Sequence, residues 1–359
     1  DGNKFIDMLC SYGPIIIGHR EPQIDKKVIA QIKKKGFCFS LTQPIHNQIS
    51  QELKKLIPSC DMSILVKTGS DATTAAIRAA RCFTKKNKIL RCGYHGWHDW
   101  CAEVQGGIPK NSINDVIEFQ YNNINSVKKI IKEHKKDIAA IITTPISHPL
   151  GKNVEMPKDG FLEELRMICS SQGIVLIFDE IRSGFRVNLG GAQKFFGVTP
   201  DLSTFGKAMA NGYEIAALVG KEEIMSVYEK KAFISSTYFE NSLSIIAALE
   251  TIKFLKNNNV VKDIKAKGNY FEKKILKIIN NYSEDCEFSG GPWMPYITFK
   301  KDLDGKYKLK RKSFFTNLIR RGVFAQPFHH SYIAYRHSYK DLDYVADAIE
   351  DSLKNMNSK

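Results

Sequence analysis

The chain has 359 residues, 43% of them apolar and 25% charged, a composition that is typical of a globular protein and excludes a disordered or fibrous one. This length accommodates one large and one smaller domain. The net charge of +15 comes from lysine pairs scattered along the chain, with no basic stripe interleaved with aromatic residues. We therefore expect no nucleic-acid partner and at most a modest attraction for anionic metabolites.

The cysteines and the hydropathy pattern indicate a cytoplasmic protein. The eight cysteines form no CxxC pair and no regular spacing, which is typical of a reducing compartment and predicts neither disulfides nor a zinc site. No signal peptide and no apolar run long enough to cross a membrane is visible, so we expect no membrane partner. The chain begins at Asp1 without a methionine, and we expect that an N-terminal stretch precedes it.

The predicted elements indicate an α/β protein. Residues 1–45 predict a hairpin, over "KFIDML" and "PIIIGH", followed by a helix. Next, short apolar runs alternate with amphipathic ones, which is typical of βαβ units and of a mostly parallel sheet covered by helices on both faces. The expected strands are 64–69, 88–94, 138–145, 173–180 and 215–220, and the expected helices are 71–86, 125–136 and 160–172.

The C-terminal part differs from this central region. From about residue 255 onward, long helical patterns mix with short strand candidates such as "WMPYITF" and "GVFAQP". We therefore expect a large domain over residues 46–254. A smaller α/β domain would be built from the N-terminal segment, 1–45, together with residues 255–359.

Three loops at expected strand ends carry candidate functional residues, because ligands of open α/β sheets bind there. Gly69 permits a tight turn and Ser70 can cap the helix that follows, whose free amides could hold a phosphate, although an ordinary helix cap has the same pattern. Asp179 ends an apolar strand and needs a cationic or hydrogen-bonding partner, although lone acidic strand ends are common. Lys207 stands among small and apolar residues, where a lowered pKa would free its amine, although most such lysines reach solvent.

Together these three loops meet the requirements of pyridoxal phosphate. This cofactor needs a phosphate cup, an anion opposite its pyridine nitrogen and a lysine that forms a Schiff base with it. Gly69 with Ser70, Asp179 and Lys207 occur in that order along the chain. Since the amine must be neutral to attack, we predict a depressed pKa for Lys207.

Longer stretches resemble the class III aminotransferases, especially the branch that contains glutamate-1-semialdehyde aminomutase. The resemblance covers nearly the whole chain and is most specific over residues 179–212. The stretches that carry it are "GSDATTAAIRAAR", "YHGWHD", "LIFDEIRSGFR", "GGAQKFFGVTPDLSTFGKAMANG" and "TYFENSLSIIAALE". It implies a fold-type-I enzyme that binds pyridoxal phosphate, with Lys207 as the Schiff-base lysine and Asp179 paired to the pyridine nitrogen.

The resemblance also implies further cofactor contacts. Tyr94 matches the aromatic residue that stacks on the cofactor ring, and His95 follows it in the same turn. Thr237 matches a threonine that reaches the phosphate in the neighbouring subunit, which implies a homodimer with shared active sites. Tyr12 lies where the family places an aromatic residue of the substrate pocket.

Two loops, 144–153 and 325–337, depart from the family pattern, and so does the segment around Glu240. Thr144 and Pro145 stand where the family often has Glu-Pro, and in the loop that follows we expect His148 to contact the ring hydroxyl of the cofactor. Glu240 lies near the expected phosphate site and would repel an anion unless it turns away. The tail 325–337 contains three histidines with Arg336, for which we expect no metal; Arg336 could instead meet a substrate carboxylate or phosphate.

The expected function is an aminotransferase that moves an amino group from an amino-acid donor to a small oxo acceptor. An intramolecular aminomutase or an amino-acid epimerase on the same scaffold is the alternative, because sites rather than folds decide the reaction. A binding or regulatory protein that lost catalysis is disfavoured, because both Lys207 and Asp179 are present.

Overall fold

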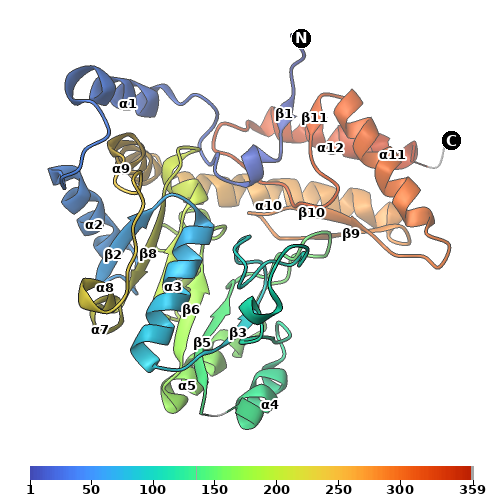
Figure 1. Cartoon of the computed structure of the whole chain (residues 1–359). Coiled ribbons are helices and arrows are strands. Elements are labelled where there is room, and N and C mark those ends of the chain that lie inside the picture. The colour runs from blue at the N-terminus through green and yellow to red at the C-terminus, as the bar shows by residue number, and fades with distance from the viewer. Residues whose placement is uncertain (135, 357–359) are drawn as a thin grey trace. The chain divides into compact units, whose positions relative to one another are not determined.

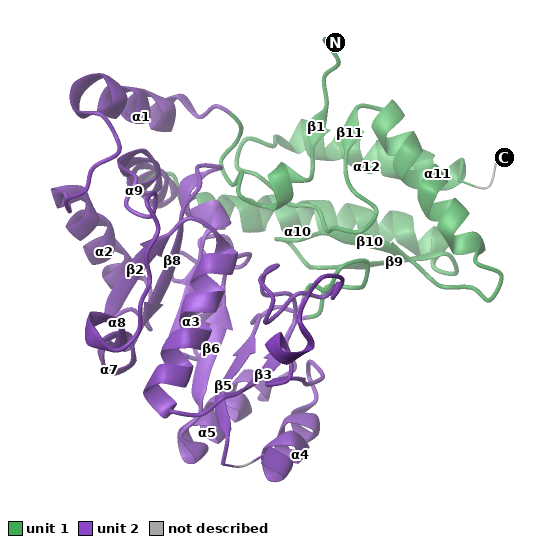
Figure 2. Cartoon of the chain, in the orientation of Figure 1, with its two compact units in different colours: residues 1–19, 148–155, 257–359 green, residues 20–147, 156–256 purple. Residues whose placement is uncertain are grey.

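The computed structural model describes residues 1–134 and 136–356 and divides into two compact units (Figures 1 and 2). Unit 1 comprises residues 1–19, 148–155 and those from 257 onward, and unit 2 comprises residues 20–147 and 156–256. The described chain contains no helix that is both long and apolar enough to span a membrane. All eight cysteines are free thiols.

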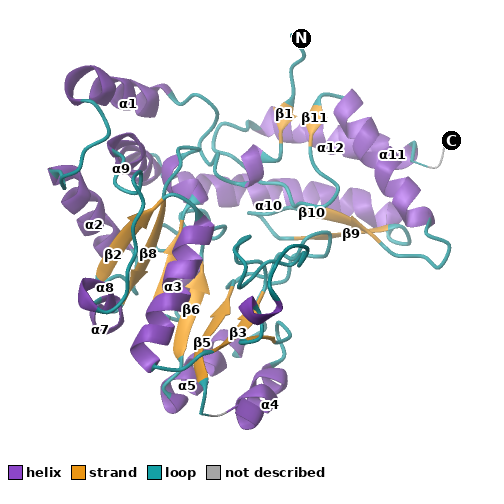
Figure 3. Ribbon diagram, viewed as in Figure 1, coloured by secondary structure: helices purple, strands orange, loops and turns teal. Residues whose placement is uncertain are grey.

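A seven-stranded sheet forms the centre of unit 2 (Figure 3). Its order is β2-β8-β7-β6-β5-β3-β4, and only β8 runs antiparallel to its neighbours. The predicted α/β class with a mostly parallel sheet is therefore confirmed. The strands are β2 (Met62–Val66), β3 (Lys88–Cys92), β4 (Val116–Glu118), β5 (Ile138–Thr143), β6 (Val175–Asp179), β7 (Leu202–Phe205) and β8 (Ala216–Gly220).

Helices cover both faces of this sheet, so its central strands are apolar along their whole length. Val175 and Ile177 of β6 belong to a core cluster with α3, whereas Leu176 and Phe178 belong to a second cluster with α4 and α5. Alternate residues of one strand thus face opposite helical layers. The helices involved are α3 (Gly69–Thr84), α4 (Ile124–His134), α5 (Phe161–Gln172), α7 (Glu222–Met225) and α8 (Val227–Lys230).

Residues 20–45 belong to the larger unit, whereas the sequence-based boundary grouped them with the smaller domain. The Tyr213 hydroxyl donates a hydrogen bond to Asp25 over 2.9 Å, and the Ser242 amide donates to the Phe37 carbonyl over 3.0 Å. These contacts hold the segment within unit 2. The other helices of unit 2 are α1 (Pro22–Lys35), α2 (Pro44–Leu56), η2 (Lys110–Ser112), α6 (Gly191–Phe196), η3 (Lys207–Ala210) and α9 (Ser242–Asn257, whose last residue belongs to unit 1).

Unit 1 combines two small sheets with three long helices. The elements are β1 (Ile6–Asp7), η1 (Cys10–Tyr12), α10 (Val260–Ile279), η4 (Asn280–Tyr282), β9 (Cys286–Ser289), β10 (Tyr296–Phe299), α11 (Lys306–Arg320), β11 (Val323–Phe324) and α12 (Tyr339–Lys354). The predicted N-terminal hairpin is wrong, because β1 pairs in parallel with β11. The carboxylate of Asp7 accepts hydrogen bonds from the amides of Leu9 and Cys10. The chain therefore bends into η1 after β1 and does not form the second strand of a hairpin.

Candidate active site

The parallel sheet brings the candidate residues of three strands to one edge. Asp179 ends β6 and is paired with Thr204 of β7, and Lys207 follows two residues after that strand ends. Thr144 follows directly after β5, whose last residue pairs with Phe178. Because the carboxyl ends of parallel strands meet at the same edge, side chains far apart in the sequence converge here.

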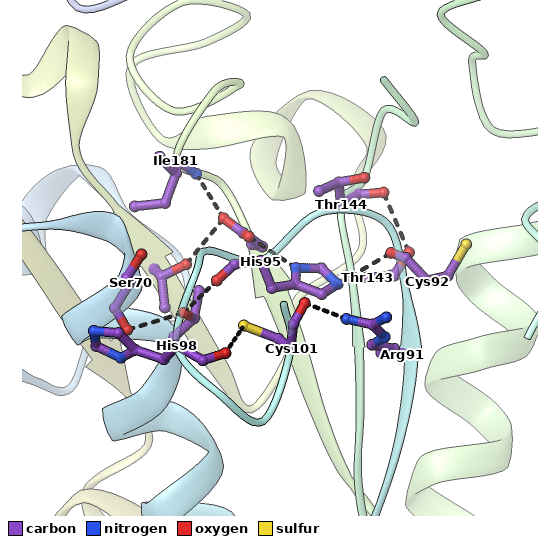
Figure 4. A network of polar contacts seen from close by, with 12 residues as sticks. Ser70, Arg91, Cys92, His95, His98, Cys101, Thr143, Thr144 and Ile181 are labelled. Atoms are coloured by element: carbon purple, nitrogen blue, oxygen red, sulfur yellow. Dashed lines mark hydrogen bonds and ion pairs between the residues drawn. The ribbon is translucent and has the colours of Figure 1, made fainter. Parts of the chain in front are cut away.

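Asp179 is buried and receives hydrogen bonds on both carboxylate oxygens. His95 Nδ1 lies 2.8 Å from Oδ2, while Oδ1 accepts the Ile181 amide over 3.1 Å and the Thr204 hydroxyl over 3.2 Å. The exposed fraction of Asp179 is 5%, so these partners replace the water that a carboxylate requires. Figure 4 shows His95 and Ile181 within the network of polar contacts in this region.

His95 has an oxygen acceptor at each ring nitrogen. Its Nε2 lies 3.1 Å from the carbonyl oxygen of Cys92, opposite the contact of Nδ1 with Asp179. A ring N–H at Nδ1 donates to the carboxylate, which accepts only. The two contacts hold the ring in a fixed orientation beside Asp179.

The start of α3 leaves two backbone amides available. The helix begins at Gly69, earlier than predicted. Thr68 caps it: its hydroxyl accepts a hydrogen bond from the Asp71 amide, and the Asp71 carboxylate accepts one from the Thr68 amide. The amides of Gly69 and Ser70 have no hydrogen-bond partner within the described chain. Free amides in the first turn of a helix attract anions, so the geometry fits a phosphate.

The turn after β3 packs closely on this helix start. The Trp97 amide lies 3.4 Å from the Ser70 hydroxyl oxygen, and the Thr73 hydroxyl donates to the His95 carbonyl over 2.7 Å. Gly96 has a φ of +121°, and a Cβ there would lie 2.5 Å from the Ser70 hydroxyl. Glycine is therefore required at this position for the turn to hold His95 beside the start of α3.

Lys207 is the first residue of η3 and has a left-handed backbone, with a φ of 44°. Burial lowers the pKa of its amine to about 8, and the nearby guanidinium of Arg182 acts in the same direction. Asp179 opposes this shift by stabilising the charged form. At a given pH, the amine of Lys207 is therefore neutral in a larger fraction of molecules than the amine of an ordinary lysine, as predicted from the sequence.

Several polar residues of this region are additional to those predicted. Thr204 was missed because β7 is short and was not among the expected strands. Arg182 and the fully buried Arg186 both depress the pKa of Lys207. The hydroxyl of buried Thr144 has no hydrogen-bond partner in the described chain, which makes it suited to contact a bound group.

The remaining predicted residues have diverse surroundings. Tyr94 is half-buried, with the Arg182 guanidinium 5.8 Å from its ring centroid, and burial raises the pKa of its hydroxyl. Thr237 is exposed in the segment before α9. A carboxylate oxygen of Glu240 lies 3.9 Å from His46 Nε2, so this charge has a partner in unit 2.

Three predicted residues belong to unit 1, and their roles stay predictions. Tyr12 meets the His329 ring edge-on, with 5.0 Å between the ring centroids. His148 lies 5.7 Å from His330 by the same measure. Arg336 places its guanidinium 5.6 Å from the Tyr335 ring. The described residues contain no group of three or more metal-ligating side chains that could hold an ion.

The residues of unit 2 fit pyridoxal phosphate. The buried carboxylate of Asp179 suits a pyridine nitrogen, the amine of Lys207 has a lowered pKa, and the amides of Gly69 and Ser70 suit a phosphate. Each of these groups is of the chemical type that the cofactor needs at the corresponding atom.

Comparisons with known proteins agree with this chemistry. The family model described as aminotransferase class-III matches residues 1–355. The chain is 58% identical to the 3-aminobutyryl-CoA aminotransferase of Cloacimonas acidaminovorans (strain Evry), over 98% of this chain and 85% of that protein. It is 32% identical to the glutamate-1-semialdehyde 2,1-aminomutase 2 of Lachnoclostridium phytofermentans, over 99% of this chain and 88% of that protein. The FumI protein of Sphingopyxis sp. MTA144, solved in a form with pyridoxal phosphate, shares 25% identity and a TM-score of 0.92 over 98% of this chain and 84% of that one.

Lys207 should react with amine-directed reagents at a lower pH than an ordinary lysine. Since burial lowers its pKa to about 8, half of the side chains carry the neutral amine near that pH, whereas a free lysine reaches this point only near ~10.4. Pulse acetylation of the cofactor-free protein over a pH series, followed by mass spectrometry of the peptide that contains Lys207, measures the midpoint. A midpoint equal to that of a lysine-containing control peptide would contradict the lowered pKa.

Proposed function

Since the chain belongs to the class III aminotransferases, we propose that Lys207 carries pyridoxal phosphate covalently and moves the reacting proton, and that Asp179 faces the pyridine nitrogen. One observation carries this assignment. Asp179, whose buried carboxylate has three hydrogen-bond partners, ends β6. Lys207, whose amine has a lowered pKa, follows the neighbouring strand β7.

The protein is an aminotransferase and its cofactor is pyridoxal phosphate. It transfers an amino group from a small-molecule amino donor to an oxo acceptor. When bound, the cofactor supplies a ring that accepts the electron pair left on the substrate carbon after its proton departs. The aminomutases are more distant relatives than the aminotransferase, at 32% identity for one of them against 58%.

The side chains of unit 2 have separate tasks in this proposal. Lys207 Nζ would take the proton from the substrate carbon as a neutral base and, as the resulting acid, deliver it to the C4′ carbon of the cofactor. Asp179, oriented by its hydrogen bond with His95, keeps the proton on the ring nitrogen. The amides of Gly69 and Ser70 hold the phosphate, and the Tyr94 ring covers one face of the site.

Removing the Lys207 amine should abolish covalent attachment of the cofactor. For Lys207→Ala we expect activity to fall by at least about 10³-fold, because a general base contributes roughly 10²–10⁴ and the attachment point is also lost. Borohydride reduction followed by mass spectrometry of the intact protein detects the attachment. Lys230→Ala, an exposed lysine of the same unit, should keep both properties. Retained attachment in Lys207→Ala would remove Lys207 from this role.

We propose that the amino donor is a β-amino acyl thioester of coenzyme A. The support is the 58% identity to the 3-aminobutyryl-CoA aminotransferase across 98% of this chain. A chain with a net charge of +15 also attracts anionic substrates, and a coenzyme A thioester carries several phosphates.

A half-reaction tests this substrate class. We expect 3-aminobutyryl-CoA, mixed with the holoenzyme without an acceptor, to change the cofactor absorbance and to release the 3-oxo thioester, which mass spectrometry identifies. Free 3-aminobutyrate should react more slowly, because it lacks the binding energy of the nucleotide. Equal rates for both compounds would contradict the thioester. An amino group returned to the same molecule, with no oxo product, would favour an aminomutase.

We also propose a homodimer in which Thr237 contacts the phosphate bound to the partner subunit. The support is the exposure of the segment around Thr237, where the exposed fractions of Phe233 and Tyr238 are 76% and 59%. Sedimentation equilibrium should give twice the mass of the chain, and Thr237→Val should weaken cofactor binding with the dimer intact. A monomer of full activity would exclude shared sites.

A further inference from the structure

We propose that a basic cavity along α11 binds the phosphorylated nucleotide of a coenzyme A thioester. The cavity has a volume of about 660 Å³ and is lined by one face of α11 and by residues 324–328, all within unit 1. This volume is in the range of small-molecule sites. The inference rests on the substrate class proposed above and assigns residues to its recognition.

The charge of the cavity is uncompensated. Lys308, Lys312 and Arg320 follow one another at multiples of four residues on α11, so their side chains form a stripe, and Arg311 lies beside it. None of these four cations forms an ion pair within the described chain, and no acidic residue lines the cavity. Unpaired cations gathered at one cavity are suited to a ligand with several phosphates.

Neighbouring cations on the same helix differ in this respect. Lys306 lies 3.0 Å from Asp304, and Lys310 forms an ion pair with Asp285 over 2.5 Å. The basic residues of α11 outside the cavity therefore have carboxylate partners, whereas those inside it do not. General lysine enrichment would not produce this division along a single helix.

The cavity also offers a flat apolar wall. The Arg311 guanidinium lies 4.3 Å from the centroid of the Phe328 ring, and the Phe328 side chain is 51% exposed. Phe324 adds a second exposed ring to the lining. Aromatic rings and arginine planes stack on nucleotide bases, so the wall fits the adenine ring while the surrounding cations face its phosphates.

The chain connects this cavity to the residues expected to meet the substrate. Phe328 is followed by His329, whose ring contacts Tyr12, the aromatic residue expected in the substrate pocket. The Gly151 amide donates to the Phe328 carbonyl over 3.0 Å, which joins the two loops that depart from the family pattern. A free amino acid would leave the four cations without an anionic partner, whereas a nucleotide engages them.

Matched variants test the proposal through the substrate's Michaelis constant. For Lys308→Gln with Lys312→Gln we expect KM for 3-aminobutyryl-CoA to rise about tenfold or more with kcat unchanged, because two charge-assisted contacts are lost. KM for 3-aminobutyryl-pantetheine, which lacks the nucleotide, should stay the same. The control, Lys301→Gln with Lys306→Gln, removes the same charge from exposed positions outside the cavity and should leave both constants unchanged.

Three outcomes would overturn the proposal. An equal rise of KM in both double variants would indicate a general charge effect. An unchanged KM in the cavity variant would exclude these lysines. Equal KM values for the two thioesters in the unmodified enzyme would show that the nucleotide is not recognised.

Calorimetric titration with adenosine 3′,5′-bisphosphate separates this proposal from the proposed function. If neither thioester reacts but the bisphosphate binds the holoenzyme and its binding is lost in the cavity variant, the substrate class fails and the nucleotide site stands. If 3-aminobutyryl-CoA reacts but the bisphosphate does not bind, the substrate class stands and the cavity proposal fails. Binding of inorganic phosphate with equal strength would also overturn the nucleotide assignment.

Discussion

The candidate site depends on how one buried carboxylate is stabilised. Asp179 lies at the end of a strand that is covered by helices on both faces, where an unpartnered charge would be costly. Its partners come from three parts of the chain, namely the β7 strand, the turn after β3 and the backbone that leaves β6. Because a single carboxylate joins these parts, its stabilisation depends both on the strand order and on the conformation of the turn around Gly96.

The central part of the fold could be predicted because its signals are local. Apolar runs of strand length separated by amphipathic helices indicate a parallel sheet, and the residues at strand ends then share one edge. Asp179 was found in this way, whereas Lys207 was found from the small and apolar residues around it, because the strand before it was not among those expected. Thr204 was not predicted, because it lies in a strand of four residues. The sequence singled out Thr144 only as a departure from the family pattern, and its burial without a partner is visible only in the structure. Such properties depend on neighbours that are distant in the sequence.

The N-terminal segment shows a different limit. Two apolar runs joined by a turn are typical of a hairpin, yet Ile6 and Asp7 pair with a strand more than three hundred residues away in the sequence. No local pattern distinguishes these alternatives, because strand pairing depends on which partner edge the folded chain offers.

The basic cavity presents a similar case. Its lysines resemble all others in composition, and only the absence of carboxylates around them sets them apart.

The left-handed backbone at Lys207 affects how the site is prepared. A residue other than glycine in this conformation costs about 1 kcal/mol or more, and the surrounding fold supplies that free energy whether or not a ligand is present. The direction of the Cα–Cβ bond is therefore set during folding, and binding energy is not consumed in orienting the lysine backbone. This preorganisation also restricts evolution at the position. Glycine would relieve the strain but remove the amine, so conformational stability and chemistry place opposing demands on the same residue.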